Sequence, residues 1–196
     1  DRNFNANYGG IPKNVWLHVT DKLYQTLPLY SNLKTTGVYI YAEDIRVKSR
    51  KAVLHAESEV RNEYGRAKEV SYRAELIDRD GRLLKTFESA PVVVKPGEQT
   101  VLKASSEVDG LHFWSWGYGY LYVVKTSLWV DGEKVDEVST RTGFRKTRFG
   151  KGMIWLNDRV IQVKGFAQRT SNEWPGVGMS VPAWLSDYSN GLMVEG

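Results

Sequence analysis

Apolar and polar side chains alternate at every second residue through most of this chain, and this pattern restricts the fold more than any other feature of the sequence. Within residues 51–60, the small or apolar side chains lie two residues apart: Leu54, Ala56, Ser58 and Val60. The intervening positions carry polar side chains: His55, Glu57 and Glu59. A half-buried β-strand needs a period of two residues, whereas a helix needs about 3.6. The segment therefore predicts a strand with one buried face.

The same alternation predicts eight strands separated by short turns. They span residues 38–47, 51–60, 69–76, 83–87, 100–104, 120–130, 134–138 and 153–164. Several are separated by dipeptides that tolerate a positive φ: Asp80-Gly81, Pro96-Gly97, Asp109-Gly110 and Asp131-Gly132. Short strands joined by tight turns favour antiparallel hairpins. The sequence therefore predicts an all-β fold, with an immunoglobulin-like antiparallel β-sandwich over residues 33–143.

The two ends of the chain do not fit this sandwich. Residues 15–20 alternate and predict one strand, which we interpret as the end of a preceding domain, and residues 21–34 are predicted to be a linker. After Phe144 the pattern changes to one apolar hairpin and then to a stretch rich in Gly, Pro, Ser and Asn. Residues 180–191 have an early Pro and a closing Gly, which predict a short helix. Since the chain also begins without Met, we expect it to be a piece of a longer protein.

Composition and charge limit the classes of function. With 41% hydrophobic and 26% charged residues, the chain has the composition of a folded protein. Its 27 basic and 23 acidic residues give a net charge of +4, a mild excess for a nucleic-acid-binding protein. The basic stretches at residues 46–51 and 141–148 are expected to be solvated strand faces and ends, so nucleic acid is a less favoured partner. No run approaches the ~20 apolar residues of a membrane span.

Few residues can support metal or cofactor chemistry. Cysteine is absent, which excludes disulfides and thiolate metal sites but leaves the compartment open. His18, His55 and His112 lie far apart, and no pair has the spacing of metal ligands. His55 shares its strand face with Glu57 and Glu59, so we expect a surface imidazole near carboxylates. No nucleophile elbow, phosphate-binding loop or dinucleotide fingerprint occurs, and we expect neither a metal nor a cofactor.

Tryptophan is frequent, and several of the 7 residues do not face the predicted core. Trp129 shares its strand face with Lys125 and Ser127. Such an aromatic ring can stack on a sugar or pack against a neighbouring domain, and we favour the second interpretation. Trp114 and Trp116 could likewise bind a sugar or pack within the protein. For these two residues we favour a loop that folds over the end of the sandwich.

Three separated motifs occur in one order along the chain. The first, Gly10-Ile-Pro-Lys-Asn-Val-Trp-Leu17, is similar to G-I-W-R-x-V-W-L, with Pro12 in place of a Trp. The second is Trp114-Ser115 with Leu121-Tyr122, similar to W-S-P-E-x-P-x-L-Y. Three residues inside this second motif depart from the pattern: Trp116, Gly117 and Gly119.

The third motif is Arg141-Thr-Gly-Phe-Arg145 followed by Leu156-Asn157 and Lys164-Gly165, similar to R-x-G-F-R…L-N-G…r-G. In their order and spacing, the three motifs resemble those of glycoside hydrolase family 2, the group of β-galactosidases, β-glucuronidases and β-mannosidases. The resemblance covers nearly the whole chain.

The resemblance implies three parts. Residues 1–32 would be the end of an amino-terminal jelly-roll domain and a linker, residues 33–143 the sandwich, and residues 144–196 the incomplete start of a (β/α)₈ catalytic barrel, which needs about 250 residues. Family members hydrolyse β-linked sugars with retention, using two carboxyl groups about 5–5.5 Å apart. Both glutamates come from later barrel strands. The resemblance therefore implies that this chain contains no catalytic residue and is inactive alone.

Two Asn-Glu pairs imitate the pair that carries the acid/base in such barrels. Asn62-Glu63 lies in the predicted sandwich, and Asn172-Glu173 comes just after the first barrel strand, too early for the fourth. We therefore reject both pairs as the acid/base.

The loop after the first barrel strand also differs from the family pattern. Many members continue r-G-V-N-R-H-E, whereas this chain reads Ala167-Gln168-Arg169-Thr170 after Phe166. In the family this loop reaches the sugar pocket. The resemblance thus implies Arg169, Glu173 and Trp174 as a different set of substrate-binding residues, with Arg169 attracting a carboxylate or sulfate. An ordinary loop without ligand contact is the alternative.

We therefore expect a non-catalytic sandwich-domain fragment of a retaining, β-galactosidase-like glycosidase. Its partners would be its own jelly-roll and barrel domains and, through the whole protein, a carbohydrate substrate. An independent carbohydrate-binding or adhesion module is the first alternative, and a basic nucleic-acid-binding domain is the second. For the parent we favour the periplasm or the extracellular space over the cytoplasm. The sequence does not specify the sugar, the linkage or the oligomeric state.

Overall fold

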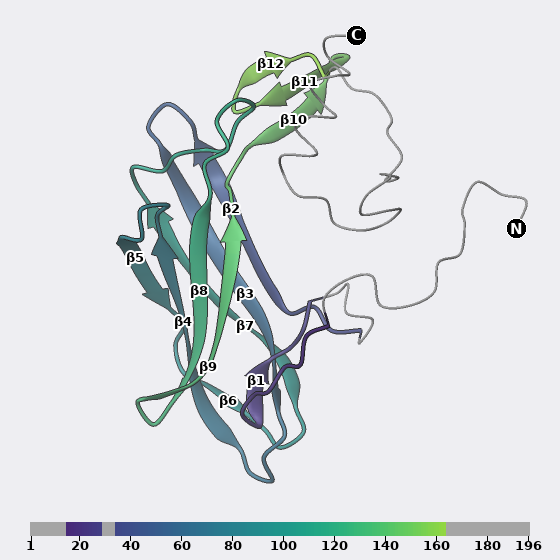
Figure 1. Ribbon diagram of the computed structural model, residues 1–196, viewed down its shortest axis with the longest axis vertical. Coiled ribbons are helices and arrows are strands. Elements are labelled where there is room, and N and C mark those ends of the chain that lie inside the picture. Colours follow the sequence, from purple (N-terminus) through teal and green to yellow (C-terminus); the bar gives the residue numbers. More distant parts are fainter. Residues whose placement is uncertain (1–14, 29–33, 164–196) are drawn as a thin grey trace, which may run out of the picture. The chain divides into compact units, whose positions relative to one another are not determined.

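Every regular element in the computed structural model is a β-strand within residues 15–28 and 34–163, the part of the chain that it describes (Figure 1). The strands are β1 (Leu23–Gln25), β2 (Val38–Arg46), β3 (Lys51–Asn62), β4 (Lys68–Ile77), β5 (Leu83–Glu88), β6 (Val92–Val94), β7 (Gln99–Val108), β8 (Tyr122–Val130), β9 (Glu133–Thr142), β10 (Thr147–Gly150), β11 (Met153–Leu156) and β12 (Arg159–Ile161). In the described residues, no helix has the length and hydrophobicity to cross a membrane. The prediction of an all-β fold is confirmed.

Two antiparallel sheets form the body of Thr20–Gln162, which is one compact unit. In the first sheet, β7 pairs along one side of β3, while β1 and β2 follow one another along the other side. The second sheet has the order β5-β4-β8-β9, and β6 continues β5 along β4. Figure 1 shows the long strands of both sheets running in similar directions. This arrangement is that of an immunoglobulin-like sandwich.

The hydrophobic core lies between these two sheets. From β3 it receives Leu54, Ala56 and Val60, which are the residues that the alternation assigns to the inner face. From β4 it receives Tyr72 and Leu76, in the same alternating pattern. Burial of one such large apolar side chain contributes about 1.5–3 kcal/mol. The two-residue period therefore fixes which face of each strand packs inward.

Three segments differ from the sequence-based predictions. Leu23–Gln25, which the sequence predicts as linker, form β1, whereas residues 15–20, predicted as a strand, have no regular structure. A strand needs a partner for its backbone groups, and local alternation does not reveal that partner. The predicted strand at 153–164 is divided by a turn in which Asn157 and Asp158 have φ values of 48° and 65°. The helix predicted at 180–191 lies outside the described residues.

Two short strands fall outside the predicted strand ranges, although β10 lies in the apolar hairpin predicted after Phe144. Val92–Val94 form β6 and Thr147–Gly150 form β10. Three consecutive valines and a four-residue strand show too little alternation to be recognised, since the period becomes visible only over a longer run.

A buried amide joins the two sheets at β1. Gln25 is 4% exposed, and both its backbone N–H and its Nε2 donate to Asp136 Oδ2 on β9, at 2.8 and 3.2 Å. Its Oε1 accepts from Ser58 Oγ on β3 at 3.0 Å and from Thr126 Oγ1 on β8 at 2.7 Å. Because the backbone of β1 pairs with β3, this one residue connects strands of both sheets.

We expect Gln25→Ala to lower the free energy of unfolding by about 1–3 kcal/mol, because the buried hydroxyls of Ser58 and Thr126 lose an acceptor and the Asp136 carboxylate loses one of its two donors. Urea unfolding followed by tryptophan fluorescence measures this change. Gln162→Ala is the matched control, since Gln162 is exposed, and its unfolding midpoint should equal that of the wild type. An unchanged midpoint for Gln25→Ala would contradict the connecting role of this amide.

Candidate functional site

Three segments far apart in the sequence meet at one end of the sandwich. The N–H of Trp114 donates to the carbonyl of Phe144 at 2.8 Å, and Asn157 Nδ2 donates to the carbonyl of Trp114 at 2.9 Å. Asn157 also exchanges two hydrogen bonds with Lys146: its Oδ1 accepts from the Lys146 N–H at 3.0 Å, and its N–H donates to the Lys146 carbonyl at 2.8 Å. We call Trp114, Gly143, Phe144, Lys146 and Asn157 the motif junction.

Asn157 is the centre of this junction. It is 8% exposed, and with Asp158 it forms the turn between β11 and β12 in the left-handed region, which Asn and Asp tolerate better than most residues. Lys146 Nζ lies 2.8 Å from Asp158 Oδ1, so the turn is also held by an ion pair. The buried amide therefore satisfies backbone groups of two other segments and ties the β11–β12 hairpin to the sandwich.

Gly143 permits the close approach of these segments. A Cβ atom at this position would lie 2.9 Å from the Tyr120 carbonyl oxygen, 3.0 Å from Trp114 Cβ and 3.1 Å from Leu121 Cδ2. These distances are shorter than ordinary carbon contacts, so a larger residue must displace the loop. The sequence identified Gly143 only as part of a motif, and its structural role follows from these contacts.

Aromatic side chains pack beside the junction. Phe144 is buried, and its ring centroid lies 5.5 Å from that of Tyr122. The Arg145 guanidinium lies 5.4 Å from the ring centroid of Trp114, a cation–π distance. Tyr122 Oη accepts a hydrogen bond from the His112 N–H at 2.7 Å, and burial raises the pKa of Tyr122 to about 12. The Tyr122 hydroxyl, which belongs to the second motif, therefore stays protonated at neutral pH.

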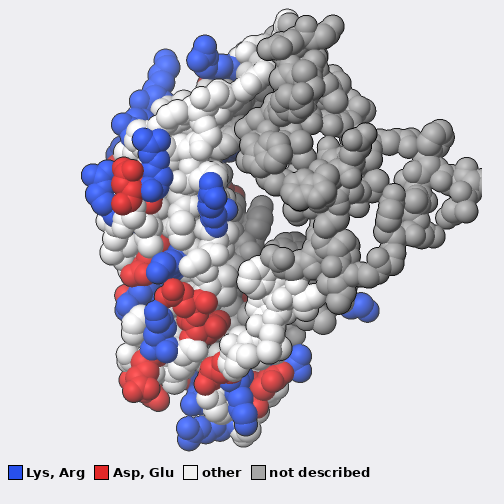
Figure 2. Space-filling view, in the orientation of Figure 1, with Lys and Arg blue, Asp and Glu red and all other residues white. Residues whose placement is uncertain are grey.

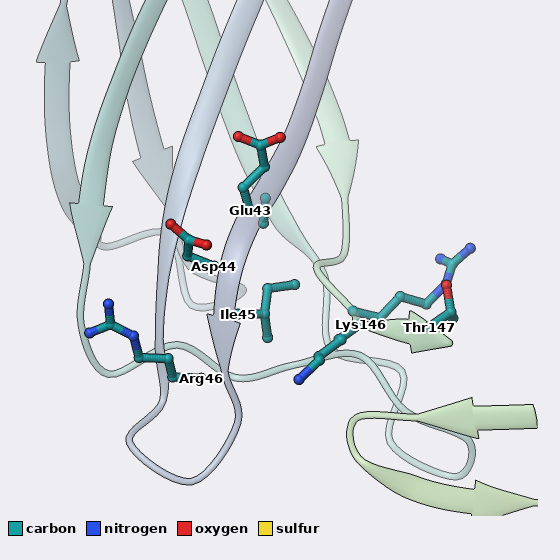
Figure 3. Close-up of a pocket in the computed structure, with 8 residues that line it drawn as sticks. Glu43, Asp44, Ile45, Arg46, Lys146 and Thr147 are labelled. Atoms are coloured by element: carbon teal, nitrogen blue, oxygen red, sulfur yellow. The ribbon is translucent and has the colours of Figure 1, made fainter. Parts of the chain in front are cut away.

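An open depression of about 630 Å³ lies beside Arg145 and Lys146, which belong to the basic stretch at residues 141–148. Its lining residues are Ala42, Glu43, Asp44, Ile45, Arg46, Arg145, Lys146 and Thr147. The pairing of β2 shifts register between Glu43 and Arg46, and Asp44 has a φ of 49°. Figure 3 shows the charged side chains of β2 on one side and Lys146 and Thr147 on the other. Since both signs of charge line it, the depression suits a polar ligand better than an apolar one.

His55 lies near a carboxylate, as expected from the sequence, but its side chain is only 22% exposed and not the surface imidazole that was expected. Its Nε2 is 3.1 Å from Glu43 Oε2, at an ion-pair distance without hydrogen-bond alignment, and its ring stacks on Tyr41 with centroids 4.8 Å apart. Glu57 accepts from Lys103 Nζ at 2.9 Å and from Tyr41 Oη at 3.0 Å, and these bonds hold the pKa of Glu57 below its usual value. In the described part of the chain, no group of three or more potential ligands could hold a metal ion.

The tryptophans occupy different environments. Trp129 is half-buried: the Arg73 guanidinium lies 4.4 Å from its ring centroid, and its Nε1 donates to Ser127 Oγ at 2.8 Å. One face of this ring is therefore covered by the protein itself. Trp114 is half-buried in the motif junction, whereas Trp116 is 64% exposed at the turn of its loop.

Several side chains of the basic runs have partners. Lys51 Nζ lies 2.7 Å from Asp109 Oδ1, and the Arg148 guanidinium lies 4.1 Å from the ring centroid of Trp155. Figure 2 shows basic and acidic side chains interspersed on the described surface that faces the viewer. Such a mixture is typical of a solvated protein surface.

The residues that the sequence analysis named for substrate binding lie outside the described residues. They are Arg169, Glu173 and Trp174, and the same holds for the loop 167–170 and for most of the first motif. The structure instead brings together parts of the second and third motifs, and it adds Lys146, which no motif singled out.

Gly143→Ala should lower the free energy of unfolding by about 1–3 kcal/mol, because the added methyl group overlaps a carbonyl oxygen and two side chains. Thermal unfolding followed by circular dichroism tests this expectation. Gly65→Ala is the matched control, since a Cβ at Gly65 would meet no heavy atom within 4 Å. If both variants unfold at the same temperature, the close packing at the motif junction is wrong.

Known proteins resemble this chain in sequence. Residues 38–145 match the family described as "Glycosyl hydrolases family 2". A β-glucuronidase of Formosa agariphila is 32% identical over 193 residues, which are 98% of this chain and 19% of that protein.

Solved structures give the same result. A β-glucuronidase from glycoside hydrolase family 2 is 30% identical with a TM-score of 0.74, and the match covers 89% of this chain and 18% of that one. A putative β-galactosidase from Bacteroides fragilis shares the fold at 20% identity and a TM-score of 0.71, over 89% of this chain and 25% of that one. The chain thus spans about a fifth of the length of the glucuronidases that it matches.

The match to residues 38–145 covers more than half of the 196 residues and includes the second motif and the beginning of the third. It confirms the resemblance that the motifs indicated: the chain belongs to glycosyl hydrolases family 2.

Proposed function

We propose that this chain is a non-catalytic part of a retaining β-glycosidase, and that its sandwich supports and orients the catalytic domain of the whole protein. The observation that carries this proposal is the motif junction. Four hydrogen bonds there connect Trp114, Phe144, Lys146 and Asn157. They hold the β11–β12 hairpin on the end of the sandwich, so that β12 leaves the sandwich from a fixed position.

An apolar face on the small sheet of β10, β11 and β12 supports the same proposal. The register of the three strands places Phe149, Ile154 and Ile161 side by side on one face. Phe149 is 76% exposed. Contiguous apolar side chains in contact with water favour packing against another part of a protein. We infer that this face packs against the domain that follows in the whole protein.

The division into family domains is part of the proposal. Residues 1–32 are assigned to the end of the jelly roll with its linker, residues 33–143 to the sandwich, and residues 144–196 to the start of the barrel. The order of the three motifs supports this division. The acid/base and the nucleophile would then both lie in barrel strands that follow.

β-Glucuronides are the substrates that we propose for the whole protein. The Formosa agariphila relative is named a β-glucuronidase, and the less similar Bacteroides fragilis protein a putative β-galactosidase. These names favour a uronic acid over the galactoside that the sequence analysis expected. Arg169 would bind its carboxylate, because a guanidinium fits a carboxylate with two parallel hydrogen bonds. Glu173 and Trp174 are proposed as further contacts to the sugar.

A carbohydrate-binding module is the second candidate, and the exposed side chain of Trp116 favours it. Trp129 favours it less, because Arg73 covers one face of the ring. A titration of the protein with oligosaccharides, followed by tryptophan fluorescence, shows which of the two residues binds the sugar. A shift that is lost in Trp116→Ala and retained in Trp129→Ala would support a binding loop, and an unresponsive wild type would exclude the module for the sugars tested.

We expect the chain to release no 4-nitrophenol from aryl β-glucuronides, β-galactosides or β-mannosides beyond the rate in buffer, because it lacks the proposed catalytic pair. Absorbance at neutral pH measures the release, and the Formosa agariphila β-glucuronidase serves as the positive control. Clear hydrolysis would contradict the non-catalytic proposal. Glu173→Gln and its matched control Glu63→Gln would then show which Asn-Glu pair carries the activity.

A further inference from the structure

A histidine holds the loop of residues 111–121 on the end of the sandwich. His112 Nε2 lies 2.8 Å from Arg50 Nη2, and its Nδ1 lies 2.8 Å from Tyr118 Oη. The backbone N–H donates to Tyr122 Oη, and the imidazole stacks on the Tyr120 ring with centroids 4.6 Å apart. Both ring nitrogens therefore have a hydrogen-bond partner, one inside the loop and one outside it.

These contacts require a neutral imidazole. A guanidinium has only N–H donors, so Arg50 donates to His112 Nε2, which must carry a lone pair. The single ring proton then lies on Nδ1 and is donated to Tyr118 Oη. If Nε2 also gained a proton, it would become a donor that faces the N–H donor of Arg50. The hydrogen bond from Arg50 would then be lost.

The surroundings of the ring oppose a second positive charge. Arg50 also donates to the carbonyls of Gly110 and Leu111, at 2.6 and 3.0 Å, so it cannot move away without releasing the start of the loop. Arg79 lies 5.3 Å from the centroid of the tyrosine ring that stacks on the imidazole. Burial lowers the pKa of His112, and the charges of Arg50 and Arg79 lower it further.

Among the described residues, the titratable and charged groups that face the imidazole are two arginines and three tyrosines. They are Arg50 in the β2–β3 turn, Arg79 after β4, Tyr118 and Tyr120 in the loop, and Tyr122 at the start of β8. None of these groups is an anion at neutral pH, so none offsets a charge on His112.

The loop carries two exposed aromatic side chains. Ser115 and Tyr118 exchange two backbone hydrogen bonds of 2.9 Å, which close a turn with Gly117 at a φ of 74°. Trp116 at this turn is largely exposed, and so is much of Tyr118. Trp116 and Gly117 stand where the motif has Pro and Glu, so this turn is a feature of this chain rather than of the motif.

We propose that His112 is a pH-sensitive latch: the start of the loop of residues 111–121 is closed on Arg50 while the imidazole is neutral, and it opens when a second proton breaks the bond to Arg50, whereas Trp114 stays bonded to Phe144. In the open loop the pKa of His112 returns toward its ordinary 6.5, so the open state binds the proton more readily than the closed state. The closed loop therefore loses stability as the pH falls below about 6.5. This inference does not depend on the proposed function.

The position of the ring proton provides the first test. Proton–nitrogen NMR of the imidazole in the full chain shows at pH 7.5 which nitrogen is protonated. We expect the proton on Nδ1 of His112 and a titration midpoint below 6.5. A proton on Nε2, or a midpoint at or above 6.5, would overturn the latch.

Hydrogen exchange provides the second test. After correction for the intrinsic exchange rate, the amides of Leu111 and His112 should lose protection by up to about tenfold per pH unit below pH 6.5, while the amides of Trp114 and of β3 should not change. His112→Gln retains a donor and an acceptor but cannot titrate, so its loop protection should not depend on pH. His55→Gln is the matched control and should behave as the wild type.

Loop protection that is independent of pH in the wild type, or that still depends on pH in His112→Gln, would overturn the proposal. If His112→Gln does not fold, the ring-proton measurement on the wild type decides.

Discussion

The buried amide of Asn157 is the interaction on which the end of this sandwich depends. It is 8% exposed and makes part-buried hydrogen bonds to the backbone at Trp114 and Lys146. Buried polar groups without partners are costly, so the three segments can meet only where all of these bonds form together. The left-handed turn at Asn157 and the close approach of Trp114 to Gly143 accompany these bonds in the same region.

Strands could be predicted where one face is buried and the other is solvated. The strand predicted at 51–60 appears as Lys51–Asn62, with the inner face as expected, because packing on the second sheet imposes the alternation. β1 could not be predicted in this way. Gln25 is polar, and the residues that bind it are distant in the sequence: Ser58, Thr126 and Asp136 lie 33, 101 and 111 positions away. Only the folded chain reveals that this glutamine is buried.

The residues of the candidate site could be predicted in part, but their contacts could not. The motifs pointed to Trp114, Gly143 and Asn157, yet a motif does not state which atoms meet. Arg50 and His112 are 62 positions apart and belong to no motif, so their contact could not be inferred. Partners across strands depend on register, and a shift by one residue would bring the opposite faces together.

The second sheet ends on one side in two short strands instead of one long strand. β5 and β6 follow each other along β4, with Pro91 in the interval between them. A continuous outer strand presents a row of free amide and carbonyl groups that can recruit the edge of another molecule. Here the row is broken, and proline contributes no amide hydrogen to it. This edge therefore offers a poorer template for pairing with another chain than one continuous strand would.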